Sequence, residues 1–551
     1  MKMLKKSSLF LMSTLLFTTS LVACSKTNTE PSSATVAPTA STSTTSTTTP
    51  KTEENKYKDA IELSVAIWDV ESGLAKSKDD ALYQFLSKKF NVTFKPVGIT
   101  WDDYAQKINL WAASDSLPDI FSIDAIGTPT FYNWVNQGIV KPIPKDLSGY
   151  PNLSKYLDVK DIQATKINGQ FYGIPRRTYS SLNYNANDRI IFYRWDWAQA
   201  AGVTKEPETF DEYKDMMVKI VASNPEGKKP VGLTGLPKTA PDVLWTYSNP
   251  LASSDGSGAD SKWIKEDGKF IPAVFSKNSI PTLKMARDWF AAGIIDKDLP
   301  LLKGEQHYEK FASGKAASIV VSGGYINGYK KIEKDRFNKV YPDKKFTDAV
   351  KSLKPLTSLD GNKYHPVFKT YWSESYFNAK INDKKLARIL DLYDYLLSDE
   401  GKRLVSYGFE NVDYKLDGAK IIPIDPKVVI GEKYPSTLVF NTLATWETPY
   451  TVDDPNDQSW VNKDLQKDAI SYMQFVKTKT KIPDFSPELT LVSTPAKDKF
   501  TVINSDLLIK IMASKDDVEQ MFTKEIDAYK GKGLDKVIEE VNAKAQQLGI
   551  K

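Results

Sequence analysis

Histidine and cysteine, two side chains that often perform catalysis, are scarce in this chain of 551 residues. It has two histidines, His307 and His365, far apart in the sequence, and a single cysteine, Cys24. The HExxH, GxSxG, Walker and GxGxxG motifs, which carry metal, nucleophile and nucleotide chemistry, are all missing. Because zinc needs cysteine or histidine ligands, we expect no metal site of this kind and no cofactor.

Carboxylates are plentiful and leave one catalytic alternative open. A glycosidase needs only two of them, one protonated and one ionised. Glu374 and Glu447, which each follow a tryptophan closely, are the pair for this alternative. Because the chain has 69 acidic residues, two of them near tryptophans are expected by chance. The sequence therefore predicts a protein that is not an enzyme, with a surface glycoside hydrolase as the alternative.

Aromatic side chains favour a binding role instead. The chain has 12 Trp, 27 Tyr and 24 Phe, and the flat faces of Trp and Tyr suit sugar rings. Sugar hydroxyls are held by carboxylates, amides and guanidinium groups, most strongly in a cleft that excludes water. Core packing explains any single aromatic equally well, and an exposed hinge surface explains the arginines, so we expect only part of the set to line a cleft. The candidate ligand-binding residues are Trp68, Asp69, Asp124, Arg176, Arg177, Tyr179, Trp245, Tyr247, Tyr325, Trp372, Glu374 and Trp446.

Alternating strands and helices are expected to position the first of these residues. Apolar and polar side chains alternate along residues 61–67, which predicts a strand that ends at Trp68-Asp69. Ligands of α/β sheets sit at the carboxyl ends of strands, where Trp68, Asp69 and Asp124 fall. The expected elements are a strand at 61–67, a helix capped by Asp79-Asp80, a strand at 92–97, a helix at 101–113 and a strand at 117–124.

Residues 167–201 are the stretch around which the rest of the chain is organised. Asn168-Gly169 favours a tight turn, because both residues tolerate positive φ. An extended run follows, stops at Pro175 and resumes from Tyr179 to Tyr184, before a strand at 190–192. This pattern predicts a crossing between two lobes beside a ligand cleft.

Further helices and strands are expected downstream of this crossing. Ser514 can cap the first of two C-terminal helices, with Asp517 three residues later, and Gly531 and Gly533 separate the two. The other expected elements are helices at 210–221, 280–292 and 387–397, a strand at 314–321 and a hairpin around Asp267-Gly268.

Several of these segments resemble the extracellular solute-binding proteins of ABC importers. The segment NGQFYGIP at 168–175, the word PDI at 118–120 and the turn GIID at 293–296 are similar to the family's sugar-binding branch, which includes maltose-binding proteins. The run from Glu400-Gly401 to Tyr414 resembles a signature of the large Gram-positive lipoproteins. It departs from that signature at Asn411 and Asp413, which replace a Gly and a His.

The resemblance implies an α/β fold of the type II periplasmic-binding-protein kind. Each of its two lobes is a mixed sheet flanked by helices, and hinge crossovers join them. The implied division is residues 57–180 for the N-terminal lobe, 181–320 for the main part of the C-terminal lobe, 321–380 for a return to the N-terminal lobe and cleft, and 381–551 for helices and loops that complete both lobes.

Some relatives in this family carry a calcium loop after the helix that corresponds to 210–221. Here that place reads SNPEGKKP at 223–230. Calcium takes six to eight oxygen ligands, several of them from carboxylates, which one Glu beside two Lys cannot supply. We therefore expect this calcium site to be lost, and we interpret the Asp-rich stretches at 453–457 and 255–258 as solvated turns.

The N-terminus predicts a lipoprotein. Lys2, Lys5 and Lys6 precede an apolar segment at 9–16, which is shorter than a membrane-spanning helix. Leu21-Val22-Ala23-Cys24 resembles a lipobox, in which Cys24 is lipidated after residues 1–23 are removed. Residues 24–56 are rich in Ser, Thr and Pro and are expected to form a disordered tether.

The charge balance excludes a nucleic-acid footprint, because 74 Lys and Arg face 69 Asp and Glu. Attachment to the membrane is therefore expected through the lipid on Cys24 and not through a basic patch. The expected partners are a small-molecule carbohydrate and the permease subunits of an ABC transporter, and the protein is expected to act as a monomer on the extracytoplasmic face of the membrane. A peptide or another solute as cargo remains an alternative.

Overall fold

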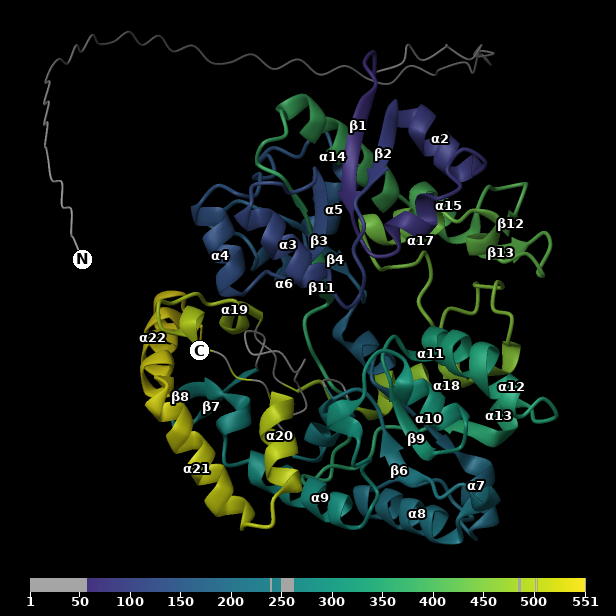
Figure 1. Cartoon of the computed structure of the whole chain (residues 1–551), viewed down its shortest axis with the longest axis vertical. Coiled ribbons are helices and arrows are strands. Elements are labelled where there is room, and N and C mark those ends of the chain that lie inside the picture. The colour runs from purple at the N-terminus through teal and green to yellow at the C-terminus, as the bar shows by residue number, and fades with distance from the viewer. Residues whose placement is uncertain are drawn as a thin grey trace, which may run out of the picture. The chain divides into compact units, whose positions relative to one another are not determined.

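Two sheets with separate cores organise the part of the chain that a computed structural model describes, residues 57–237, 240–248, 262–483, 487–500, 502 and 504–550 (Figure 1). The expected signal peptide, the lipidation site Cys24, the tether and the turn at 255–258 lie outside these residues. Within them, no helix is both long and apolar enough to cross a membrane.

The first sheet has the strand order β2-β1-β3-β11-β4. β1 pairs in parallel with β2 and β3, whereas β11 is antiparallel to β3 and β4. The central strand β3 is buried at every position, because helices cover both faces of the sheet. The strands are β1 (Ile61–Ala66), β2 (Val92–Pro96), β3 (Ile120–Ile123), β4 (Ile174–Arg177) and β11 (Tyr371–Phe377).

The second sheet has the order β10-β5-β9-β6 and is also mixed. β9 is antiparallel to β5 and parallel to β6, and β10 is antiparallel to β5. The strands are β5 (Ile190–Arg194), β6 (Val231–Thr234), β9 (Ala316–Val321) and β10 (Val350–Ser352). Two hairpins complete the strands, β7 (Trp263–Glu266) with β8 (Lys269–Pro272) and β12 (Tyr414–Asp417) with β13 (Lys420–Pro423).

Helices divide between the hydrophobic clusters around the first sheet and those around the second, and these two groups define a first and a second lobe. Those of the first lobe are α1 (Val70–Leu74), α2 (Ala81–Phe90), α3 (Tyr104–Ala113), α4 (Pro129–Asn136), α5 (Pro151–Leu157), α6 (Lys160–Gln163), α14 (Asp383–Leu397), α15 (Asp399–Tyr407), α16 (Ile430–Lys433) and α17 (Thr437–Leu443). Those of the second lobe are α7 (Trp195–Ala200), α8 (Phe210–Ser223), α9 (Ser279–Ala291), α10 (Gln306–Ala312), α11 (Gly324–Asn327), α12 (Asn338–Val340), α13 (Phe346–Ala349), α18 (Lys463–Lys479), α19 (Pro487–Thr490), α20 (Asn504–Ala513), α21 (Val518–Gly531) and α22 (Leu534–Gln547).

The chain passes between the two lobes three times. It leaves the first sheet after β4 and enters the second with β5, returns between β10 and β11, and leaves the first core again between α17 and α18. β10 still pairs with β5, so the return segment expected at 321–380 carries its first strand in the second sheet and β11 in the first.

Local side-chain chemistry explains several predicted elements. The Asp80 side chain accepts hydrogen bonds from the Leu82 and Tyr83 backbone N–H groups and caps α2, as expected. Asn168 and Gly169 have φ of 51° and 76°, which closes the predicted tight turn between Ile167 and Gln170.

Three local predictions are wrong. Pro175 lies inside β4, where its missing N–H is tolerated, and does not end the strand. The segment expected to be extended up to Tyr184 contains a 3₁₀ helix, Leu182–Asn187. Asp517, not Ser514, caps α21, because its side chain accepts from the Glu519 and Gln520 N–H groups.

Candidate functional site

One edge of the first sheet gathers eight of the twelve candidate residues: Trp446, described below, and seven that lie on its strands or directly after them. The carboxyl ends of β1, β3 and β4 lead to Trp68-Asp69, Asp124 and Arg176-Arg177. Because β11 runs antiparallel to β3 and β4, its amino end, with Trp372 and Glu374, meets the same edge. The strand topology therefore brings together residues that are up to about 300 positions apart in the sequence.

Five rings form an aromatic cluster at this edge: Trp68, Trp101, Tyr104, Trp372 and Trp446. The Trp68 ring stacks on Trp101 at a centroid distance of 4.8 Å and on Trp372 at 5.2 Å. Trp101 also stacks on Trp372, at 5.9 Å and an interplanar angle of 14°. The ring centroid of Trp446 lies 5.8 Å from that of Trp372, and the Trp446 indole N–H donates to the Trp372 carbonyl at 3.1 Å.

The cluster is graded from buried to exposed. Trp68 is 2% exposed, Trp372 and Trp446 are half-buried, and Trp101 is 53% exposed. A large exposed indole that stacks on its neighbours presents a flat apolar face to solvent, which is the shape that a pyranose or furanose ring packs against. The cluster therefore has the geometry of a stacking platform.

A β-bulge in β11 aims Trp372 at this platform. The register of β11 with β4 shifts between Tyr371 and Glu374, and Ser373 has a positive φ of 60°. Positive φ is costly for a residue with a Cβ and persists where the surroundings impose it. The Ser373 hydroxyl accepts a hydrogen bond from the Arg176 guanidinium, which supplies that constraint.

Arg176 lies beneath the aromatic rings. It is fully buried, and its guanidinium carbon is 4.9 Å from the Trp68 ring and 5.2 Å from the Trp446 ring. It also donates to the Ser122 hydroxyl at 2.8 Å. Burial lowers the pKa of Arg176 to about 10, so the side chain stays charged at neutral pH.

Glu374 is buried beside the cluster. One of its carboxyl oxygens accepts from the Ala125 N–H at 2.9 Å and from the Tyr376 hydroxyl at 2.9 Å. Burial, and then the nearby charge of Asp124, raise the pKa of Glu374 to about 7. Asp124 is ion-paired with Lys369 at 3.1 Å.

Three buried polar atoms in and beside the aromatic cluster have no hydrogen-bond partner within the described protein: Trp68 Nε1, Arg176 Nε and Glu374 Oε1. Buried polar groups are nearly always paired, so a group of exceptions in one place indicates atoms that bind a ligand or water. All three belong to residues that the sequence singled out.

Arg177 and Trp446 lie at this edge where two of the segments that pass between the lobes begin, after β4 and after α17. The backbone N–H of Trp446 donates to the Arg177 carbonyl at 2.9 Å, and the Arg177 guanidinium is ion-paired with Glu447 at 3.1 Å. Lys402 approaches the other oxygen of Glu447 at 3.5 Å. Both carboxylates of the glycosidase alternative are therefore held by groups of the protein itself, Glu374 by two hydrogen-bond donors and Glu447 by these two cations.

The remaining candidates lie apart from the cluster. Trp245 and Tyr325 are 2% and 0% exposed and belong to the two cores of the second lobe. Tyr325 donates its hydroxyl to Ser352 at 2.8 Å. Tyr247 packs edge-on against Phe210, with ring centroids 5.0 Å apart. Tyr179 is buried in the segment between β4 and β5.

Trp101 and Tyr104 are the two cluster residues that the sequence did not single out, because both were assigned to the helix expected at 101–113. The helix begins only at Tyr104. The Asp103 carboxylate accepts from the Thr100 N–H at 2.7 Å and closes a turn that keeps Trp101 outside the helix, after β2. A carboxylate three residues after Thr100 was the signal that could have moved the helix start.

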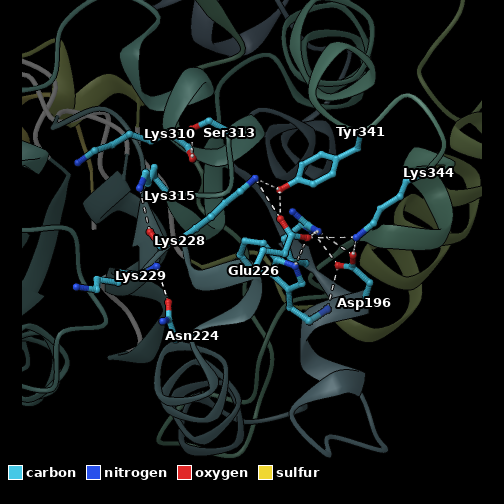
Figure 2. Close-up of polar contacts among 12 residues, drawn as sticks. Asp196, Asn224, Glu226, Lys228, Lys229, Lys310, Ser313, Lys315, Tyr341 and Lys344 are labelled. Carbon is cyan, nitrogen blue, oxygen red and sulfur yellow. Dashed lines mark hydrogen bonds and ion pairs between the residues drawn. The ribbon is translucent and has the colours of Figure 1, made fainter.

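The loop at residues 224–229, called here the Glu226 loop, follows α8 at the place where some relatives carry a calcium loop and where we expect that site to be lost (Figure 2). The Glu226 carboxylate accepts from the Tyr341 hydroxyl at 2.8 Å and the Trp197 indole at 3.2 Å, and it is ion-paired with Lys228 at 3.1 Å and Lys344 at 3.3 Å. Burial acts to raise the pKa of Glu226, but hydrogen bonds from Tyr341, Lys228 and Trp197 outweigh it and lower the pKa to about 2.

Arg194 supports the same loop from β5. Its guanidinium is fully buried, lies 3.8 Å from the Trp197 ring, and is ion-paired with Asp196 at 2.7 Å and with Glu226 at 3.5 Å. Lys344 joins Asp196 at 3.0 Å (Figure 2). The carboxylates of this region are thus paired with cations that the chain itself supplies.

In the described part of the chain, no cluster of three or more His, Cys, Asp or Glu side chains is arranged to hold a metal ion. The two histidines are separate buried residues, and burial lowers the pKa of each to about 4. His365 contacts the Thr480 hydroxyl at 3.1 Å and the Leu182 carbonyl at 3.2 Å, which is a packing role.

Comparisons with known proteins show which family this chain belongs to. A family model described as "Bacterial extracellular solute-binding protein" matches residues 75–403. The chain is 23% identical over 466 residues to the polygalacturonan/rhamnogalacturonan-binding protein YtcQ of Bacillus subtilis (strain 168), which covers 82% of this chain and 85% of YtcQ. It is also 23% identical over 503 residues to lipoprotein LipO of the same organism, which covers 88% of this chain and 89% of LipO.

A solved structure shows the same fold. The S. pneumoniae ABC-transporter substrate binding protein FusA, as an EF-hand mutant in complex with fructo-nystose, aligns with a TM-score of 0.64 and 16% identity over 89% of this chain and 99% of that chain. The prediction of a two-lobed type II fold, with a mixed sheet in each lobe, is confirmed.

Proposed function

Because the chain belongs to the family of bacterial extracellular solute-binding proteins, we propose that it captures a carbohydrate outside the cell and delivers it to the permease of an ABC transporter. The observation that carries the proposal is the aromatic cluster at the carboxyl edge of the first sheet. Trp101 and Trp372 stack there with an interplanar angle of 14° and offer parallel indole faces to a sugar ring.

Polar groups around the rings bind the hydroxyls of the ligand in this proposal. Asp69 is exposed directly after Trp68, and Asp124 is half-buried at the end of β3. The unpaired Trp68 Nε1 and Glu374 Oε1 supply a donor and an acceptor for a hydroxyl or a bridging water. Trp245 and Tyr325 are left out of the proposed site, because burial in the second lobe keeps both from a ligand.

Movement of the two lobes about their connections closes the site. Three segments join the lobes, and Arg177, Tyr179 and Trp446 lie in or next to them. Closure that excludes water strengthens every hydrogen bond to a sugar, and in hinge-type proteins it is the functional step. Tyr247, half-buried in the second lobe, is proposed to meet the ligand from that side.

A lipid on Cys24 holds the protein to the extracytoplasmic face of the membrane. The lipobox-like Leu21-Val22-Ala23-Cys24 and the relative LipO, which is named a lipoprotein, support this part of the proposal. Replacement of Cys24 by Ala removes the acceptor, so the variant is expected in the culture medium and the unmodified protein in the membrane fraction. Equal membrane retention of both proteins would exclude the lipid anchor.

The proposed function includes no chemical reaction. FusA is named a substrate binding protein and YtcQ a binding protein, and the family model describes binding proteins. The internal partners of Glu374 and Glu447 also favour binding over hydrolysis.

A thermal-shift screen with oligosaccharides, followed by product analysis of every hit, tests the proposal. A ligand that binds only the folded protein raises the melting temperature in proportion to ln(1 + [L]/Kd). The expected result is a shift with one group of oligosaccharides, each recovered intact. Cleavage of the sugar would establish the hydrolase, and no shift with any sugar would move the cargo to a peptide or another solute.

Matched tryptophan variants connect the result to the cluster. Trp372→Ala removes a stacking face and is expected to weaken binding by roughly 30-fold, the effect of a residue worth about 2 kcal/mol. Trp460→Ala is the control, because Trp460 is equally half-buried but packs on the second lobe. Equal affinity in both variants would place the ligand away from the cluster.

A further inference from the structure

We propose that the site selects an uncharged saccharide and discriminates against uronic acids. The inference rests on the proposed function and narrows its substrate class. It follows from the pairing of the cations that lie beside the aromatic cluster and from the sign of the charges that remain exposed.

Arg176 is the cation closest to the rings, and the protein encloses it, with only its Nε left without a partner. It is fully buried, and its two terminal nitrogens donate to the hydroxyls of Ser122 and Ser373. The rings of Trp68 and Trp446 lie on its guanidinium at 4.9 and 5.2 Å. Its charge supports the cluster from within the protein.

The other cations at this edge already bind carboxylates of the protein. Lys369 is paired with Asp124 at 3.1 Å and has a side chain that is 7% exposed. Arg177 and Lys402 share Glu447, at 3.1 and 3.5 Å. A uronate that recruited one of them would take a cation away from a half-buried carboxylate of the protein, a loss that offsets the gain from the new pair.

Beside Tyr179, in the segment between β4 and β5, the nearby cation is also paired with carboxylates of the protein. Arg189, whose charge acts on Tyr179, is paired with Asp242 at 3.0 Å and also with Asp188. Its side chain is 10% exposed and that of Asp242 is 1% exposed. Each of these cations, at the rings and beside Tyr179, is therefore held by an internal carboxylate, apart from the enclosed Arg176.

Two exposed carboxylates directly follow cluster tryptophans in the sequence and are called here the rim. Asp69 follows Trp68 and Asp102 follows Trp101, and both are exposed. Within the described residues neither forms an ion pair. A ligand carboxylate stacked on Trp101 would lie next to these like charges, which repel it, whereas an uncharged sugar meets no such repulsion.

A panel of neutral and acidic oligosaccharides tests the inference on the full-length protein in detergent. The neutral probes are cello-, xylo-, manno-, galacto- and maltotetraose and nystose. The acidic probes are tetragalacturonate, an alginate tetramer and a glucuronic-acid-substituted xylo-oligosaccharide. Tetragalacturonate and its fully methyl-esterified form are a matched pair, because they share one backbone and differ in charge.

The expected result is binding of one or more neutral probes, with every acidic counterpart about tenfold or more weaker by calorimetry. An acidic probe that binds as well as or better than all the neutral ones would overturn the neutral preference and leave the carbohydrate receptor intact. Binding of no sugar at all would overturn the proposed function and this inference together.

A charge-reversal variant gives a second, independent readout. Asp102→Lys places an exposed cation at the rim and is expected to strengthen binding of the acidic counterpart by about tenfold at low salt, with the gain lost at high salt. The affinity for the neutral probe is expected to stay the same. Asp215→Lys on α8, exposed and in the second lobe, is the matched control and should change neither. A gain of equal size in the control would exclude the role of the rim.

Discussion

The aromatic cluster of the first lobe and the Glu226 loop of the second differ in what they leave unpaired. In and beside the cluster, three buried polar atoms lack a partner within the described protein, one indole is 53% exposed, and Ser373 holds a strained φ of 60°. In the Glu226 loop, Tyr341, Trp197, Lys228 and Lys344 all donate to a single carboxylate.

The difference separates a binding role from a structural role. A group of residues whose contacts are complete within the protein stabilises the fold and offers little to a ligand. A group that keeps unsatisfied atoms and an exposed aromatic face at one edge of a sheet gains partners only from outside. Changes in the two regions should therefore affect different measurements.

Glu226→Ala is expected to have the largest effect, a loss of about 2 kcal/mol of unfolding free energy, because it leaves the buried Arg194 with one carboxylate fewer. Ligand affinity is expected to stay the same. Urea unfolding and calorimetry on the same preparation measure both quantities.

The control for this variant is Glu309→Ala. Glu309 is an exposed carboxylate of the same lobe, ion-paired with Arg336 at 2.6 Å, and its removal should cost less than about 1 kcal/mol. Equal losses in the two variants would show that the Glu226 loop has no special structural role.

Trp101→Ala is expected to show the opposite pattern. Removal of the exposed indole should weaken sugar binding by about tenfold, equivalent to about 1.4 kcal/mol. The unfolding free energy should change by less than about 0.5 kcal/mol, because the side chain is 53% exposed. A large loss of stability with unchanged affinity would remove the distinction between the two regions.

Glu374 gives the first lobe a pH dependence of its own. Its folded-state pKa is raised to about 7 from an ordinary value of 4.5, so the folded protein binds the proton more tightly. This contribution to stability is fully present below pH 4.5 and is lost as the pH rises through 7. Glu374→Gln is unable to ionise, so between about pH 5 and pH 8 its melting temperature should fall less than that of the unmodified protein.

Glu226 has the opposite sign. Its pKa is lowered to about 2 from an ordinary value of 4.5, so its contribution to stability is present above pH 4.5 and is lost only as the pH falls toward 2. Glu226→Gln should therefore leave the slope of melting temperature between about pH 5 and pH 8 unchanged. A slope altered by Glu226→Gln and not by Glu374→Gln would reverse the assignment.

The smallest expected effect is that of a chelator. Because Lys228, Lys344 and Arg194 all pair with the single carboxylate of the Glu226 loop, we expect EDTA and added calcium to leave the melting temperature within about 1 °C. A rise with calcium that Glu226→Gln abolishes would establish a calcium site in this loop.

The sequence by itself determined the class of fold and the order of its main elements. Local apolar patterns predicted β1, β2 and β3 and helices between them, because the burial of each segment is recorded in the pattern of its own residues. Turn and cap chemistry at Asn168-Gly169 and Asp80 was equally local. The positions where the local pattern was insufficient include the hinge at 182–187 and the start of α3.

Only the tertiary structure decided which aromatic residues lie together. Trp68, Trp101, Trp372 and Trp446 come from four distant segments, and the antiparallel insertion of β11 between β3 and β4 brings them to one edge. Trp245 and Tyr325 were candidates for the same reason, as aromatic residues, but are buried in the cores of the second lobe. A sequence records the type of each side chain, whereas burial and pairing depend on contacts between segments that only the folded chain creates.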